Sequence, residues 1–422
     1  MKKRREALVR QNFPGAAGSR HEQMLDAAAR HLNASGVSLT SLGDIAVSLG
    51  VSRATLYQYI EDREDLVFQC YRRSSEVMAR HLGEAIRLGT DAVEVLSLFV
   101  ERMLDPAQPE IATRAEIAVL SQERQEIIQG LYDAIITRLA SVLEAGAQAG
   151  MLRRCDSNVN ANAIVSLVTW VPLMRYWAPP ARDYAPERFV AALKAAVLEG
   201  LAANKDTLPD YRPIDLSPLV PKVIGVFDRE AVGDAKRETL LAIASRLFNS
   251  KGIDSTALEE IAGQVGATKR TLYHHLGDKP TLLATCYARA FRIFRFISER
   301  MTRYQGDRLQ ALAASFHAIS TAYLSRDLSP LAPLVGYEAL SSETQAEMQP
   351  QAMALSQGYL STVSAGCAEG SLQVSDIPAR MLLLPGFFSW LIKDTGAHAP
   401  ERIEHIAREI SALVCQGLRR RA

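Results

Sequence analysis

Apolar residues recur at helical spacing along almost the whole chain, and the alternating pattern typical of β-strands is nearly absent. Leu25, Ala28 and Leu32 fall on one face of a helix that Gly36 can end. The same pattern returns in the second half of the chain, where Leu241, Ala244 and Phe248 precede Gly252. We therefore predict an all-α protein.

The chain contains an internal duplication. The segments His21–Ser74 and Arg237–Ala290 align without a gap and are identical at about 19 positions. Weaker similarity continues to the ends, where LEGL at Leu198 recurs as CQGL at Cys415. We expect two copies of a unit of about 200 residues, called here the first repeat and the second repeat.

A proline-rich stretch, NKDTLPDYRPIDLSPLVPK, separates the two repeats. Proline fixes φ and removes a backbone donor, so we expect a partly extended linker. The predicted domains are a basic arm (1–19), a first DNA-binding domain (20–66), a first helical domain (67–204), the linker (205–233), a second DNA-binding domain (234–282) and a second helical domain (283–422).

Each repeat has the order of a helix-turn-helix: a short helix, a glycine turn and a second short helix. In the first repeat the turn glycine is Gly50, and Ser52 is expected to cap the next helix, as Asp62 caps the one after it. In the second repeat, Thr256-x-x-Glu259 predicts a capping box.

The segments TSLGDIAVSLGVSRATLYQYIEDREDL and TALEEIAGQVGATKRTLYHHLGDKPTL resemble the DNA-binding domains of TetR/AcrR regulators. The resemblance rests on the IA pair, the glycine turn, TLY and the basic residue opening the next helix. It implies two tandem TetR-like units, each with a three-helix DNA-binding domain and a helical ligand-binding and dimerisation domain. Ile60 and Leu276 depart from the family, which usually has an aromatic there, and the family ordinarily has one unit per chain.

The resemblance also implies which side chains meet DNA in the major groove. The base-contact candidates are Arg53, Ala54, Tyr57, Lys269, Arg270 and Tyr273. The phosphate-contact candidates are Thr55, Gln58, Tyr59, Arg63, Thr271, His274, His275 and Lys279. The two DNA-binding domains (20–66 and 234–282) are called the first and second modules below. Arg270 of the second module can donate two hydrogen bonds to guanine, whereas the corresponding Ala54 of the first offers only a methyl group. This difference predicts a double-stranded operator with unlike half-sites. In the alternative interpretation, Tyr57 and Tyr273 are core residues, and Arg53 and Lys269 are solvated surface charges.

Charge is balanced overall, with a formal net charge of +1, but it is uneven locally. Residues 20–74 carry a net charge of about −1 and residues 235–290 about +3. The second module is therefore expected to be the better phosphate binder. The arm carries Lys2, Lys3, Arg4, Arg5 and Arg10; it either enters the minor groove or forms a disordered tail.

The rest of each repeat predicts a helical domain with late aromatic clusters. The candidates for lining an effector pocket are Trp170, Tyr176, Trp177, Phe387, Phe388 and Trp390. Pro172 and Pro385 lie among them and are expected to kink or break their helices. Such aromatics either enclose a pocket for a small apolar or amphipathic effector or form ordinary core packing. The terminal amphipathic stretches Pro186–Leu201 and Pro400–Leu418 resemble the dimerisation helices of the family. This resemblance implies that they pair either within one chain, as an intramolecular pseudo-dimer, or between chains, as a homodimer.

Catalytic and cofactor motifs are missing from the sequence, so we predict neither an enzyme nor a cofactor. His274 and His275 are adjacent and cannot chelate one metal from a helix, so no metal site is expected. Five scattered cysteines, no long apolar run and no apolar core in the basic N-terminal segment favour a cytoplasmic protein outside the membrane.

These patterns favour a ligand-responsive transcriptional regulator, expected to be a repressor released from its operator by its effector. The alternative is a constitutive DNA-binding or architectural protein whose helical domains serve only assembly.

Overall fold

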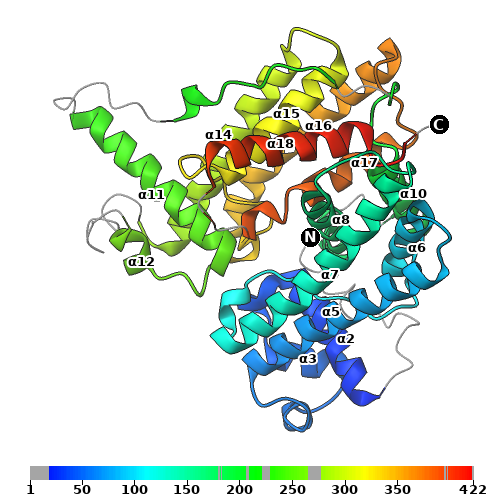
Figure 1. The fold of residues 1–422 in the computed structure, drawn as a ribbon. Coiled ribbons are helices and arrows are strands. Elements are labelled where there is room, and N and C mark those ends of the chain that lie inside the picture. Colours follow the sequence, from blue (N-terminus) through cyan, green and yellow to red (C-terminus); the bar gives the residue numbers. More distant parts are fainter. Residues whose placement is uncertain are drawn as a thin grey trace. The chain divides into compact units, whose positions relative to one another are not determined.

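The computed structural model describes residues 19–178, 181, 183–205, 209–220, 229–264, 277–393, 396 and 398–420. Within these ranges the structure is all-α, as the sequence predicts, and extended pairing is limited to two isolated bridges (Figure 1). The helices of the first repeat are α2 (Arg20–Leu39), α3 (Leu42–Leu49), α4 (Arg53–Leu56), α5 (Arg63–Leu88), α6 (Ala92–Leu104), α7 (Gln122–Gln148), α8 (Ser157–Trp177) and α10 (Pro186–Leu198). Those of the second repeat are α11 (Arg229–Lys251), α12 (Leu258–Gly263), α14 (Lys279–Thr302), α15 (Arg308–Leu324), α16 (Ser342–Glu369), α17 (Ile377–Leu383) and α18 (Pro400–Gln416). Short 3₁₀ turns are η1 (Ile117–Val119), η2 (Ser217–Leu219), η3 (Tyr337–Ala339), η4 (Leu384–Phe387) and η5 (Leu391–Lys393).

The chain forms two compact units whose limits differ from those of the repeats. Unit 1 contains the chain up to Gly200, the segment Pro378–Phe387 and the tail from Gly417. Unit 2 contains Leu201–Ile377 and Phe388–Gln416. Each unit is therefore completed by residues of the other repeat. The domain boundaries predicted from the sequence contain no such exchange and remain predictions.

In unit 1 the exchanged segment is the C-terminal tail of the second repeat. The backbone N–H groups of Leu418 and Arg419 donate to the carbonyls of Val197 and Leu198 at the end of α10, both at 2.9 Å. The N–H of Arg153 donates to the carbonyl of Leu418 at 2.8 Å. The tail thus continues the hydrogen bonding of α10.

Unit 2 has the equivalent arrangement, made by the end of the first repeat. Leu201 and Ala202 donate to the carbonyls of Val414 and Cys415 at the end of α18, at 3.1 and 2.7 Å. The N–H of Gln373 donates to the carbonyl of Leu201 at 2.9 Å. The same kind of bonding therefore forms twice, once in each unit.

The predicted helical faces are confirmed. Leu25, Ala28 and Leu32 of α2 are buried in one apolar cluster of unit 1, and their second-repeat counterparts are buried in unit 2. Gly36 and Gly252 have φ of 75° and 82°, which residues with a Cβ rarely adopt. Gly252 therefore follows the last residue of α11, and Gly36 interrupts the helical run inside α2, at the two positions where the sequence predicts helix ends.

The caps agree with the prediction at two positions and differ at one. Ser52 accepts from the N–H of Thr55 at 3.2 Å, and Asp62 accepts from that of Asp65 at 2.8 Å. The capping box predicted at Thr256 is wrong, since α12 begins at Leu258. The buried Thr256 hydroxyl instead donates to the carbonyl of Gly252 at 2.7 Å, which satisfies it inside the preceding turn.

Part of the linker is attached to unit 2. The backbone N–H of Arg212 donates to the Tyr304 hydroxyl at 2.7 Å, and Gln310 donates to the carbonyl of Asp210 at 2.7 Å. The following residues 213–218 are largely exposed.

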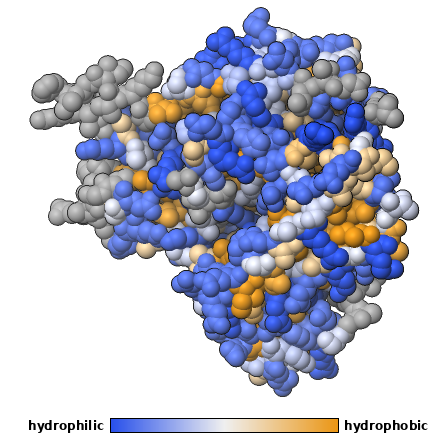
Figure 2. Space-filling model, viewed as in Figure 1, coloured by the Kyte–Doolittle hydropathy of each residue, from blue (hydrophilic) through white to orange (hydrophobic). Residues whose placement is uncertain are grey.

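On the face visible in Figure 2, hydrophilic residues predominate and hydrophobic ones form several smaller groups.

Candidate nucleic-acid interface

The helix-turn-helix of the first repeat consists of α3, the turn at Gly50 and α4. Ser41 caps α3 by accepting from the N–H of Asp44 at 3.1 Å. Gly50 has φ of 66° and donates its N–H back to the last turn of α3. Leu56 and Ile60 anchor the second part in the apolar cluster. These local interactions fix the angle at which α4 leaves the turn.

The solvent-facing side of this motif carries the predicted base-contact residues. Arg53, Ala54 and Tyr57 are exposed, as is the phosphate candidate Gln58. Tyr57 is 54% exposed, which contradicts the alternative that it is a core residue. A Cβ on Gly43 of α3 would lie 2.8 Å from the Arg53 guanidinium, so the absence of a side chain there makes room for this Arg. The motif therefore presents a cation, a methyl group and a phenol together.

The other phosphate-contact candidates of this motif, Thr55, Tyr59 and Arg63, interact with side chains or backbone of the same chain. The Thr55 hydroxyl lies 3.0 Å from that of Ser52, and the Tyr59 ring stacks on His21 with 5.8 Å between centroids. The Arg63 guanidinium donates to the carbonyl of Val37 at the end of α2. These bonds position the side chains, and their phosphate contacts remain predictions.

In the second module most predicted DNA contacts lie outside the described residues: Lys269, Arg270, Thr271, Tyr273, His274 and His275. The same holds for the arm residues Lys2, Lys3, Arg4, Arg5 and Arg10. Lys279 is described and donates to the carbonyl of Asp254 at 3.4 Å, as Arg63 does to the corresponding turn of the first repeat.

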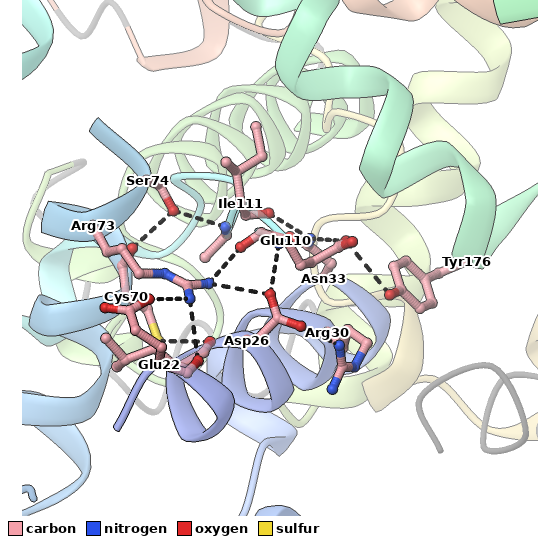
Figure 3. A network of polar contacts seen from close by, with 12 residues as sticks. Glu22, Asp26, Arg30, Asn33, Cys70, Arg73, Ser74, Glu110, Ile111 and Tyr176 are labelled. Atoms are coloured by element: carbon pink, nitrogen blue, oxygen red, sulfur yellow. Dashed lines mark hydrogen bonds and ion pairs between the residues drawn. The ribbon is translucent and has the colours of Figure 1, made fainter. Parts of the chain in front are cut away.

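A network of polar contacts joins α2 of the first module to the segment that follows α6 (Figure 3). Asp26 accepts a hydrogen bond from the backbone N–H of Glu110 at 2.6 Å. Asn33, on the same helix, donates to the carbonyl of Ile111 at 2.8 Å and to the Glu110 carboxylate at 3.1 Å. It also accepts from the N–H of Thr113 at 2.9 Å. One helix of the DNA-binding module thus holds the backbone of this segment.

Arg73 of α5 closes the network from the other side (Figure 3). Its guanidinium donates to the carbonyl of Glu110 at 2.6 Å and pairs with Glu22 of α2 at 3.2 Å. The hydroxyl of Ser74 accepts from the N–H of Ala112 at 2.8 Å. Because α2, α5 and the segment share these bonds, a shift of the segment must move α2 or break several hydrogen bonds.

A cavity of about 70 Å³ lies beside this network in unit 1. The charged residues in its wall are Asp26, Arg30, Asp105, Glu110 and Arg175. Burial raises the pKa of the Glu110 carboxyl, with Asn33 and Arg175 opposing the shift, and it raises the pKa of Tyr176. Pockets for drug-sized ligands span roughly 300–1,000 Å³. This cavity therefore holds only a very small group unless the surrounding segment moves.

The predicted pocket residues of the first repeat have different surroundings. Tyr176 lines the cavity. The indole N–H of Trp177 donates to the carbonyl of Asn33 at 3.0 Å, and that of Trp170 donates to the carbonyl of Leu382 at 2.9 Å. Main-chain oxygens therefore hold both indoles in place.

Those of the second repeat are divided between the units. Phe387 belongs to unit 1, whereas Phe388 and Trp390 belong to unit 2. Phe388 lies 6.3 Å from Phe316 and 6.5 Å from Tyr323 between ring centroids, within the core of unit 2. Their contacts with an effector stay a prediction.

Unit 2 repeats part of the network. Asn249 donates to the carbonyl of Pro330 and accepts from the N–H of Ala332, both at 2.9 Å. Arg289 pairs with Glu238 at 2.9 Å. In the alignment of the repeats these three side chains correspond to Asn33, Arg73 and Glu22.

The sequence interpretation missed this network although a signal was present. Asn33, Arg73 and Glu22 are each identical in the two repeats, and two of them are buried despite being polar. Asp26 corresponds to Ala242, so the second repeat lacks this carboxylate of the cavity wall. Residues that are identical in the two repeats therefore indicate the shared network. The residue that differs, Asp26, indicates the charged cavity that is specific to the first repeat.

The described residues contain no cluster of three or more His, Cys, Asp or Glu arranged to hold a metal ion. Among the helices the structure describes, none combines the length and apolar character needed to cross a bilayer.

Two family models match the chain. Residues 24–70 and 240–286 match bacterial regulatory proteins of the tetR family. Residues 89–180 match the tetracyclin repressor-like C-terminal domain.

Similar curated proteins cover less than half of the chain. An uncharacterized HTH-type transcriptional regulator of Bacillus subtilis, YhgD, is 23% identical over 191 residues, which are 44% of this chain and 98% of the relative. The HTH-type transcriptional regulator AcrR of Shigella flexneri is 28% identical over 138 residues, which are 29% of this chain and 64% of the relative.

Similar solved structures also cover less than half of the chain. AibR in complex with isovaleryl coenzyme A and operator DNA is 21% identical, with a TM-score of 0.36, and the match covers 42% of this chain and 97% of that one. PfmR from Thermus thermophilus is 22% identical, with a TM-score of 0.33, and the match covers 41% of this chain and 94% of that one.

Proposed function

Since the chain is a tandem fusion of two TetR-like units, we propose that it is a ligand-responsive repressor whose two modules read one operator with unlike half-sites. The exposed Arg53, Ala54 and Tyr57 support base reading by the first module. The second repeat has Lys269 and Arg270 where the first has Arg53 and Ala54, so the two modules prefer different base pairs. Access to operator DNA requires a cytoplasmic location.

The exchanged tails support an intramolecular pseudo-dimer. Each unit uses the end of the other repeat to extend its last helix, so a single chain supplies both halves of the pair. A paired helix-turn-helix protein binds half-sites about 34–36 Å apart, one helical turn of DNA. One chain therefore suffices for one operator with two half-sites.

The ligand response rests on one observation: α2 of the DNA-binding module supplies Asp26 and Arg30 to the cavity wall. A ligand that enlarges this cavity must displace the segment that Asn33 and Arg73 hold against α2. It then favours a different position of α2, provided that it binds the two states with different affinity. The charged wall favours an amphipathic effector whose polar end enters here.

The test begins with operators selected from random duplex DNA. At fixed salt, we expect at least about a thousandfold tighter binding to a selected operator than to its shuffled sequence. Compounds that raise the melting temperature are then added to the complex, and a true effector weakens operator binding at least about tenfold. Equal affinity for both DNAs would contradict sequence reading. Bound compounds that leave operator affinity unchanged would favour the constitutive architectural protein.

A further inference from the structure

The face of α8 in unit 1 that carries Trp170 is covered by a segment of the second repeat. Trp170 is only 8% exposed, and its indole N–H donates to the carbonyl of Leu382 at 2.9 Å. Gly386 is buried against the same indole. A Cβ at Gly386 would lie 3.0 Å from Trp170 and 3.1 Å from Leu167, tighter than ordinary van der Waals contact. The large side chain thus fits because the facing residue has none.

The two repeats differ at the positions that make this contact. Aligning Pro172 with Pro385 sets WVPLMRYW of the first repeat against LLPGFFSW of the second. Trp170 then corresponds to Leu383, and Gly386 corresponds to Leu173. The first repeat has large residues at both positions, and the second has a leucine and a glycine.

Pairing of like repeats would disrupt the packing that Trp170 and Gly386 make in the unlike pair. In a pair of two first repeats, Trp170 would face Leu173 where it now faces Gly386, and a whole side chain would be forced into filled space. In a pair of two second repeats, Leu383 would face Gly386 and leave a void in place of the indole. Only the unlike pair matches a large residue to a small one.

Polar contacts in unit 1 favour the unlike pair as well. Arg419 forms an ion pair with Glu199 at 3.2 Å, and the buried Arg380 donates to the carbonyl of Gly200 at 2.9 Å. When LEGL is aligned with CQGL, Arg419 corresponds to Ala202, and in the proline alignment Arg380 corresponds to Leu167. A second copy of the first repeat could supply neither cation.

We infer that the pairing surface of α8 selects the second repeat of this chain and rejects another copy of the first repeat. The two repeats form an obligate unlike pair, and fusion in one chain delivers them in equal number. This inference does not depend on the response to a ligand, and it predicts that homodimers do not form through this surface.

The test uses the intact chain with a protease site inserted after Pro213, in the exposed part of the linker. Two preparations with different mass tags are cut after folding, mixed, incubated and analysed by native mass spectrometry. We expect pairs of one N-terminal with one C-terminal fragment, and no pairs of like fragments. Like pairs in random proportion, or fragments that separate into monomers, would overturn the inference.

If the fragments change partners too slowly for mixing to report a preference, substitutions at the contact test the same inference. Gly386→Leu gives the second repeat the residue of the first, and it should lower the paired fraction of cut chains at least about fivefold. Adding Trp170→Leu should restore much of the pairing, because the indole no longer occupies the space. Gly130→Leu is the matched control, since a Cβ there meets nothing within 4 Å. Equal effects of Gly386→Leu and Gly130→Leu, or no restoration by the second change, would also overturn the inference.

Discussion

At the residue scale, the first module combines exposed side chains on its helix-turn-helix with buried polar side chains in α2 and α5. Arg53 lies over Gly43 and is exposed, whereas Asn33 and Arg73 are buried and hydrogen-bonded. The exposed residues were predicted because the helix-turn-helix pattern is local in sequence. The bonds of Asn33 join residues 77 to 80 positions apart, which a local pattern does not reveal.

Arg53→Ala is expected to weaken operator binding by about 1–3 kcal/mol and to relax the preference at one base pair, because a forked contact with guanine is lost. Fluorescence anisotropy on a set of single-base operator variants measures both effects. Arg87→Ala, at an exposed position in the last turn of α5, is the control. A uniform loss on every sequence would instead make Arg53 a phosphate contact, and an unchanged affinity would remove it from the interface.

The stability of the fold is expected to depend on pH through Glu110. Burial raises the pKa of its carboxyl, so the folded protein binds this proton more tightly than the unfolded chain. Its contribution favours the folded state at low pH and is lost as the pH rises through the raised pKa. Glu110→Gln, which cannot ionise, should therefore increase the free energy of unfolding at neutral pH and change it little near pH 4.

Urea denaturation at the two pH values measures this difference. Glu144→Gln, at an exposed position of α7, should show no such dependence on pH. An equal effect of Glu110→Gln at both pH values would mean that the carboxyl loses no stability by ionising in the folded protein.

At the scale of elements, local chemistry determined what could be predicted. The caps Ser52 and Asp62 were found because an N-cap needs only its own turn. Thr256 was misassigned because its hydroxyl has a second local acceptor, the carbonyl of Gly252. Pro172 stays inside α8, whereas Pro385 lies in the 3₁₀ turn η4. The sequence predicted a disturbance at both prolines and did not distinguish the two outcomes.

The polar network holds α2 and residues 110–113 together. Asn33→Ala removes three hydrogen bonds and leaves a buried carbonyl and N–H without partners, so we expect a loss of about 2–4 kcal/mol of stability. Hydrogen exchange should become faster at residues 110–113 and in α2. Asn249→Ala is the matched change in unit 2 and should act at residues 330–332 and in α11. Faster exchange spread evenly over both units in either variant would contradict this account.

At the scale of the whole molecule, the duplication was predictable and the exchange of segments was not. Residues 198–202 and 415–419 resemble one another, so either tail satisfies the same backbone groups locally. The difference between Trp170 with Leu173 and Leu383 with Gly386 indicates which pairing is preferred, as do the contacts of Arg380 and Arg419. The meaning of these differences requires the contacts to be known. The result is one chain that carries two unlike DNA-binding modules.

The most direct test of this account compares three operators. The first is selected from random sequence, and the other two are symmetrised versions with two left or two right half-sites. One chain with unlike modules should bind the selected operator more than tenfold tighter than either symmetrised version, since each mismatched base pair costs roughly 1–3 kcal/mol. Equal affinity for all three operators, measured at one salt concentration, would contradict the claim that both modules read sequence.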